Sequence, residues 1–579
     1  MKESGLTSST GLLSRPARMG ARLAQPQALR KALWIVPLVF GLLSILLRQD
    51  NNWDLRNYHL YNPFALLNGK IGLDLAPAQM QTYFNPAIDL LYYGLIKALP
   101  GPLAGFVMGA LHGLNFILVA LLARELLPQR ERGGNTRLCL LLALAGMFGV
   151  GFISELGNTM GDNLTALFVL GPLLLLVRHW PQLARQAAGP AAGAALAAGL
   201  LAGLGAGLKL TNAVYALSLC LALLALPASL WQRLRMSFVF GIGVLGGMAA
   251  TGGFWYWKMW TLFGNPLFPQ FNAFFHGPLA SPMGVGDLRW LPHGLGEKIL
   301  WPFIFALDPQ RVSEIKLWLF AWPVLYVAFI ALAVAALLRR RTGQASAPAP
   351  AQEAQSRQRA LWAFFALSYL IWLNLFSIYR YLIPLELLAP LVLWLIARRL
   401  LPAAIAGKAV AVVLALIILP SLHAPSWGRV GWAREVYRAE VPRIAEPQQS
   451  MVFTVHADPP MGWLATLFPA DLAFAALGSG FPESDAFRQR LADMVAARKG
   501  PLYLMVKGER ALSDPRAGSE QRTAAREADR ATLDKARTLL AAYGLVLDAA
   551  TCKTYPAFMG RAQMDFQLCR VTPQGAAGA

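Results

Sequence analysis

A polar patch with the side chains of a reaction site directly follows the first apolar run of the chain. The run extends from Leu33 to Leu47, and the patch is NNWDLRNYHLYNPFALLNGK, residues 51–70. A carboxylate close to hydrocarbon is costly unless it is paired, hydrated or employed in chemistry. Asp54 is therefore either a surface acid paired with Arg56 or a base that takes a proton from a reacting hydroxyl group.

The composition places this patch in a membrane protein. The chain has 579 residues, of which 56% are hydrophobic and 14% charged, and its mean hydropathy is +0.45. Such a chain is too apolar for an ordinary soluble core. The net charge of +21 is typical of Lys and Arg collecting in cytoplasmic loops, so we expect membrane lipids and no nucleic acid as partners.

Eleven apolar runs approach the length of about 20 residues that a membrane crossing requires. They lie near residues 32–48, 103–123, 138–153, 164–177, 190–208, 212–230, 237–256, 317–338, 361–377, 381–397 and 403–421. The run at 190–208 is rich in Ala and Gly, which predicts tight packing against neighbouring helices.

The distribution of basic residues predicts the orientation. The tail at 1–31 is basic and is expected in the cytoplasm, and with alternating crossings every inside loop is also basic, for example Arg339 to Arg341. The low-complexity stretch at 342–360 is expected to be a disordered linker. The predicted location is the inner membrane of a bacterium, with the chain leaving the last span on the periplasmic side near Ser421.

The remaining residues, 422–579, are typical of a small soluble α/β domain in the periplasm. The segments SMVFTVH and GPLYLMVKG predict strands, and residues 484–498 and 527–543 have helical spacing of apolar residues. Cys552 and Cys569 both fall in this domain. An oxidising compartment allows them to form a disulfide, which we expect.

The first external loop, residues 49–102, carries the polar patch on the outer side of the membrane. YNPFALLNG and NPAIDLLYYGLIKAL within it can form amphipathic helices lying in the membrane interface. Asp54 stands at the start of this loop, and Asp74 and Asp89 are second choices for a reactive carboxylate there.

The order of these features resembles the GT-C superfamily, polytopic glycosyltransferases that use lipid-linked sugar donors. NWDLRNYH places Asp54 where that superfamily has a catalytic base in its first external loop. SELGNTMGDNLTALFVL, GLGAGLKLTN and SIYRYLIPLELLAP resemble its further segments, and the resemblance covers roughly residues 32–421. It implies an all-α polytopic membrane module with about eleven transmembrane helices, followed here by the α/β domain.

The resemblance also implies roles for charged residues at the outer ends of the spans. Lys209 and Arg380 would bind the phosphate of a polyprenyl-phosphate sugar and stabilise its departing charge. Glu155 or Asp162 could orient the acceptor, hold a sugar hydroxyl or help to bind a divalent cation. The complete set of expected substrate-binding residues is Arg56, His59, Glu155, Asp162, Lys209, Arg380 and Tyr381. Arg380 could alternatively be an interfacial anchor beside Tyr381, and Lys209 an ordinary helix-end cation.

The expected activity is transfer of a hexosyl or pentosyl group from a polyprenyl-phosphate donor to a glycan, lipid or protein acceptor. A surface-polysaccharide polymerase or ligase is the first alternative, with its chemistry in the loop at 257–315, which contains Asp287 and Arg289. A lipid or sugar transporter is the second, although we find no internal repeat. No His or Cys cluster has the spacing of a metal site, so a divalent cation is the only cofactor considered.

Overall fold

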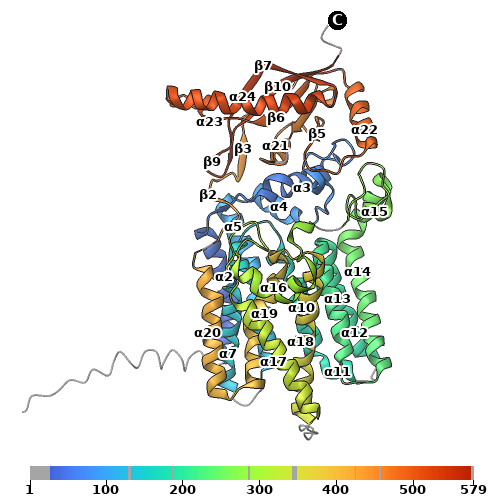
Figure 1. The fold of residues 1–579 in the computed structure, drawn as a ribbon, viewed down its shortest axis with the longest axis vertical. Helices are drawn as coiled ribbons and strands as arrows, with labels where there is room; N and C mark the ends of the chain where they lie inside the picture. The colour runs from blue at the N-terminus through green and yellow to red at the C-terminus, as the bar shows by residue number, and fades with distance from the viewer. Residues whose placement is uncertain are drawn as a thin grey trace, which may run out of the picture.

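The computed structural model describes residues 26–127, 132–185, 188–284, 287–341, 349–423, 425–455 and 458–574. Figure 1 shows a bundle of long helices with a sheet-containing domain at one end, and α3 (Tyr61–Leu67) and α4 (Asp89–Ala98) between the two. Residues 1–25 of the expected basic tail lie outside the described residues.

Seven helical stretches in the described part of the chain are long and apolar enough to cross a membrane. They are Gln27–Leu46, Gly101–Leu126, Gly189–Leu208, Leu230–Phe263, Ala321–Arg339, Tyr379–Leu400 and Ala403–Ser421. Each coincides with one of the expected runs, so the chain has the long apolar helices of a multi-pass membrane protein.

The other four expected runs fall on shorter or more polar helices. The run at 138–153 is divided between α7 (Arg132–Met147) and α8 (Val150–Ser154), 164–177 corresponds to α10 (Leu167–Arg178), 212–230 to α13 (Ala213–Ala222), and 361–377 to the second half of α18 (Ala349–Leu375). The number of eleven crossings therefore stays a prediction.

The expected disordered linker at 342–360 is wrong from residue 349 onwards. Helix α18 begins at Ala349 and continues through the low-complexity stretch into the apolar run. Ala, Gln, Glu and Arg dominate this part of the sequence and are good helix formers, which explains the helix. Residues 342–348 lie outside the described residues.

The expected tight packing of the run at 190–208 is confirmed. This run forms α12 (Ala188–Leu208), which packs along α14 (Leu230–Phe263). A Cβ atom built on Gly199 or Gly203 would lie 2.1 Å from a backbone oxygen of α14. Glycine therefore lets the two backbones approach closely, and this contact fixes the position of Lys209 at the end of α12.

We expect Gly203→Ala to destabilise the protein by about 1–3 kcal/mol or more, because the added methyl group must displace the backbone of α14. The measurement is the thermal unfolding temperature in detergent. Gly193→Ala on the same helix is the matched control, since a Cβ there meets nothing within 4 Å. Equal unfolding temperatures of the two variants would contradict the close packing.

The C-terminal domain is built on one five-stranded sheet of order β5-β4-β6-β10-β7. Its strands are β4 (Met451–Val455), β5 (Ala473–Leu477), β6 (Leu502–Lys507), β7 (Leu545–Tyr555) and β10 (Phe566–Pro573). Strand β4 runs parallel to β5 and β6, and β10 runs antiparallel to β6 and β7.

The sequence expectations for this domain are confirmed in outline. The two expected strands are β4 and β6, and the two expected helices are α22 (Asp485–Ala496) and α24 (Ser519–Ala541). The Cys552–Cys569 disulfide is present and joins β7 to β10.

The first loop and the C-terminal domain share one hydrophobic core. The backbone N–H of Leu75 donates to the oxygen of Phe474 at 2.8 Å, and the N–H of Ala476 donates to the oxygen of Leu75 at 3.0 Å. The loop thus adds a short strand segment beside β5. Helix α3 is buried in the same core, beside residues such as Trp463. Protein covers α3 from Tyr61 to Ala65, which corrects the expectation that this segment lies in the membrane interface, and Leu67 at its end is exposed.

Candidate functional site

A single helical turn places Asp54 and His59 on the same side of the first loop. Residues Leu55–His59 form the π-helix η1, whose hydrogen bonds run between residues five apart, and Asp54 stands at its N-terminus. The side chain of Asn52 accepts a hydrogen bond from the N–H of Leu55 at 2.6 Å, which fixes the start of the turn. A π-turn in a helix is frequently found at functional sites.

Arg380 contacts Asp54 although the two residues are 326 positions apart in the chain. It belongs to the short helix η6 (Tyr379–Leu382), which leads into α19 (Ile383–Leu400). Its Nη1 donates to Oδ2 of Asp54 at 2.8 Å, and its guanidinium lies over the rings of Tyr381 and Trp427, 5.2 and 5.9 Å from their centres. Nε of Arg380 is buried and has no hydrogen-bond partner among the described residues, so the guanidinium keeps a donor for another acceptor.

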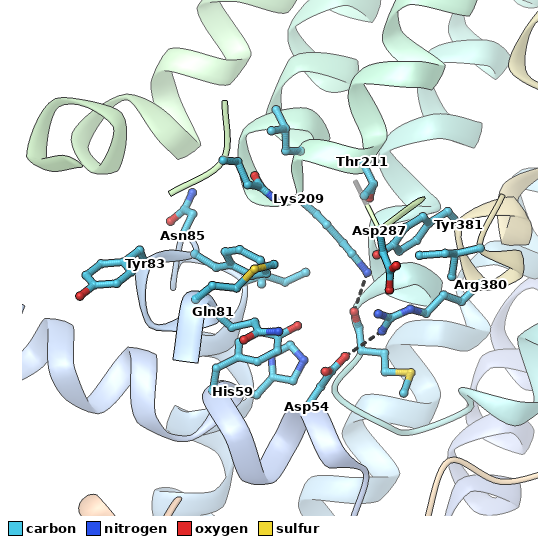
Figure 2. Close-up of a pocket in the computed structure, with 18 of the residues that line it drawn as sticks. Asp54, His59, Gln81, Tyr83, Asn85, Lys209, Thr211, Asp287, Arg380 and Tyr381 are labelled. Carbon is cyan, nitrogen blue, oxygen red and sulfur yellow. Dashed lines mark hydrogen bonds and ion pairs between the residues drawn. The ribbon is translucent and has the colours of Figure 1, made fainter. Parts of the chain in front are cut away.

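Lys209 is the third charged group at this point. Its Nζ lies 2.6 Å from Oδ1 of Asp162 and donates to the backbone oxygen of Met160 at 2.8 Å. It also lies 5.3 Å from the centre of the Tyr381 ring. Figure 2 shows Lys209, Arg380 and Asp54 converging from three different elements.

These three residues line a cavity of about 700 Å³ between the ends of the helices and the first loop. The wall also contains apolar side chains from the helix ends, including Leu208, Leu210 and Phe376. Many aromatic rings complete it: Trp53, Tyr58, Tyr83, Phe84, Trp255, Tyr256, Phe268, Trp290, Phe376, Tyr381 and Trp427. A cavity of this size with a few convergent polar groups is typical of a small-molecule or lipid-headgroup site.

The surroundings of Asp54 decide its charge. Burial acts to raise the pKa of this carboxyl group, but the positive charge of Arg380, the hydrogen bond that Arg380 donates and the charge of Lys209 outweigh it. The pKa of Asp54 is therefore held below its usual value, so the carboxyl group is ionised at neutral pH.

Three of the expected binding residues are not in the cavity wall. Arg56 lies two positions after Asp54, on the opposite side of the turn, and its charge interacts with Asp458 and Asp50. Asp162 is buried behind Lys209 and acts on the site by holding the ammonium group. Glu155 is completely buried, and neither of its carboxylate oxygens has a hydrogen-bond partner within the described ranges.

The environment of Glu155 favours its neutral form. Burial raises the pKa of Glu155 well above its usual value, and the carboxylate of Asp162 raises it further. A neutral carboxylic acid behind the wall does not fit the expected direct contact with a sugar.

Other residues of the site lie outside the expected set of binding residues, although Asp89 was a second choice for the reactive carboxylate and Asp287 and Arg289 belonged to the polymerase alternative. Asp89, at the first turn of α4, lies in the wall and contacts His59. Its only signal was an acid in an otherwise apolar segment of an external loop. Trp427 lies in the connection after the last apolar helix, where nothing in the sequence marked it. Asp287 and Arg289 from the late loop also line the cavity.

The part of the chain that the structure describes contains no group of three or more His, Cys, Asp or Glu side chains arranged to hold a metal ion. Comparison of the chain with protein-family models, with curated proteins and with solved structures finds no match.

Proposed function

We propose that this protein is a membrane glycosyltransferase that moves a sugar from a polyprenyl-phosphate donor to a hydroxyl group of an acceptor. The observation that carries the proposal is the meeting of Asp54, Lys209 and Arg380 in one cavity beside apolar helix ends. A lipid phosphate carries its charge at the membrane surface and its chain in the hydrocarbon, so its site needs cations next to an apolar wall.

Arg380 and Lys209 bind the donor phosphate in this proposal. The bond between the anomeric carbon and the phosphate oxygen breaks with its electron pair going to the phosphate, and the two cations stabilise the charge that develops there. The free Nε of Arg380 provides a hydrogen bond that the ion pair with Asp54 does not use.

Asp54 is the catalytic base. It accepts the proton of the acceptor hydroxyl as the oxygen attacks the anomeric carbon. The donor phosphate competes with Asp54 for Arg380, so donor binding loosens the ion pair and makes the carboxylate a stronger base.

The same proposal includes the orientation of the protein in the membrane and the class of acceptor. The cavity opens to the periplasmic side of a bacterial inner membrane, the N-terminus lies in the cytoplasm, and the C-terminal domain covers the site from outside. The acceptor is a glycan, a lipid or a protein.

One observation favours a polymerase or ligase of surface polysaccharide as the second candidate. Asp287 and Arg289, which belong to the loop expected to carry that chemistry, lie in the same cavity wall. They form an ion pair with each other, and the Arg289 side chain is 81% exposed, which suits contact with a long acceptor. Both candidates use the same donor lipid and differ in the acceptor.

The experiment that tests the proposal incubates the purified protein in lipid nanodiscs with a panel of polyprenyl-phosphate hexoses and pentoses. Release of free polyprenyl phosphate is measured in the presence of membrane-derived acceptors. We expect one donor to be consumed, while nucleotide sugars remain intact. No turnover of any carrier lipid would contradict the proposal and favour a transporter.

The ion pair predicts a specific pH dependence. In Arg380→Gln the main opposing charge is lost, so burial dominates and the pKa of Asp54 rises. Because the base must be ionised, kcat/KM should fall on acidification at a correspondingly higher pH than in the unsubstituted protein. Arg289→Gln, which removes a wall cation paired with Asp287, is the control. In this variant, kcat/KM should fall on acidification at the same pH as in the unsubstituted protein. If kcat/KM of Arg380→Gln falls at the same pH as that of the unsubstituted protein, Asp54 is not the titrating base.

A further inference from the structure

A buried pair of His59 and Asp89 stands beside Asp54 in the cavity wall. Nδ1 of His59 lies 2.6 Å from Oδ1 of Asp89, and both side chains are 4% exposed. His59 is the last residue of η1 and Asp89 is the first residue of α4, so the contact joins two elements that line the cavity.

The other ring nitrogen of His59 has no such partner. Nε2 is buried and makes no hydrogen bond within the part of the chain that the structure describes. Buried polar atoms are almost always paired, so an unpaired nitrogen in a cavity wall indicates an atom that arrives with the ligand. Because the carboxylate of Asp89 accepts at Nδ1, that nitrogen carries the ring proton, and Nε2 presents its lone pair.

Asp54 and His59 lie at the two ends of the same π-turn. Figure 2 shows the two side chains on the same side of the cavity, and both line its wall. A carboxylate that has taken a proton must lose it again before the next turnover.

We infer that His59, oriented by Asp89, receives the proton that Asp54 takes from the acceptor hydroxyl. The inference rests on the proposed glycosyl transfer. An imidazole suits this task because one ring nitrogen can accept a proton while the other donates to a carboxylate. Asp89 does not touch the substrate and is a positioning residue, which also stabilises the imidazolium.

The step transfers one proton from the acceptor hydroxyl to His59 by way of Asp54. The acceptor O–H bond breaks as its oxygen forms a bond to the anomeric carbon, and the bond from that carbon to the phosphate oxygen breaks. The proton moves to the carboxylate of Asp54 and then to Nε2 of His59, giving an imidazolium ion. After the products leave, the imidazolium gives the proton to water, and the site returns to its starting state.

A purely structural role for the pair makes different predictions. In that case its loss would lower the unfolding temperature by detaching α4 from η1, and any loss of activity would follow the loss of folded protein. Added small bases would then have no effect on turnover.

The experiment compares His59→Ala, His59→Gln and Asp89→Asn with the unsubstituted protein in the donor assay. We expect both His59 variants to lose kcat about 10²-fold or more, with a nearly unchanged KM for the lipid donor. Added imidazole should restore part of the kcat of His59→Ala, because the cavity adjoins the vacated position, but should not affect His59→Gln. Asp89→Asn should lower kcat at least about tenfold, and His423→Gln, an exposed histidine outside the wall, should behave as the unsubstituted protein.

The outcomes separate this inference from the proposed function. If the unsubstituted protein does not consume any polyprenyl-phosphate sugar, the proposed function fails and the inference with it. If the unsubstituted protein is active, the inference alone is overturned by full kcat in folded His59→Ala, or by a loss that imidazole does not reverse.

Discussion

Replacement of Asp54 by asparagine is expected to lower kcat for sugar transfer about 10²–10⁴-fold, with little change in the KM for the lipid donor. The amide has nearly the same shape and can still accept the hydrogen bond that Nη1 of Arg380 donates, but it cannot take a proton from the acceptor. Steady-state release of polyprenyl phosphate measures both constants.

Asp287→Asn is the matched control for this prediction. Asp287 is also a carboxylate in the cavity wall, but its partner is Arg289 from the same loop. We expect a much smaller decrease in kcat for this variant. A large loss in Asp287→Asn together with normal turnover of Asp54→Asn would move the chemistry to the late loop and favour the polymerase.

Arg380→Gln is expected to show the second large effect. It removes a cation that binds the donor phosphate and stabilises it as it leaves, so the KM for the donor should rise about tenfold or more and kcat should fall about 10²–10³-fold. Arg380→Lys should recover only part of this loss, because an ammonium group lacks the planar set of donors. Donor titrations of the three proteins provide the measurement.

The matched control for Arg380 is Arg289→Gln. It removes another cation from the wall, but one that is mostly exposed and paired with Asp287. A donor KM in Arg380→Gln equal to that of the unsubstituted protein would mean that Arg380 is an interfacial anchor, the alternative that the sequence left open.

The sequence was most informative where a residue is tied to the end of an apolar helix. Asp54 and Arg380 are 326 positions apart, yet the order of apolar runs and basic loops predicted that both lie at the outer surface. The same reasoning applies to Lys209. The Ala- and Gly-rich composition of α12 also predicted its close contact with a neighbour, because small residues allow the backbones of two apolar helices to approach closely.

Side-chain direction could not be predicted in the same way. Arg56 and Asp54 are only two positions apart, but they point to opposite sides because the chain between them is helical. Glu155 and Asp162 lie behind the wall, since the segment that carries them turns under Lys209. Nothing in the local pattern distinguishes a carboxylate in a wall from one behind it.

Contacts between distant segments also could not be predicted from the sequence. The burial of α3 depends on a domain that begins more than 300 residues later, and the hydrogen bonds of Leu75 with β5 have no sequence signal. The pairing of His59 with Asp89 was equally hidden, because it needs the fold of the whole first loop. The two predicted C-terminal strands were recognisable as short apolar runs, and the disulfide was predictable because both cysteines fall in a domain expected outside the cytoplasm.

An experimental structure of the protein in nanodiscs with a non-transferable phosphonate analogue of the donor tests the central claim most directly. We expect the phosphonate within hydrogen-bond distance of Arg380 and Lys209, and the prenyl chain along Leu208, Leu210 and Phe376. Asp54 should face the anomeric carbon from the side opposite the phosphonate. A phosphonate bound outside this cavity, or an anomeric carbon out of reach of any acceptor held by Asp54, would contradict it.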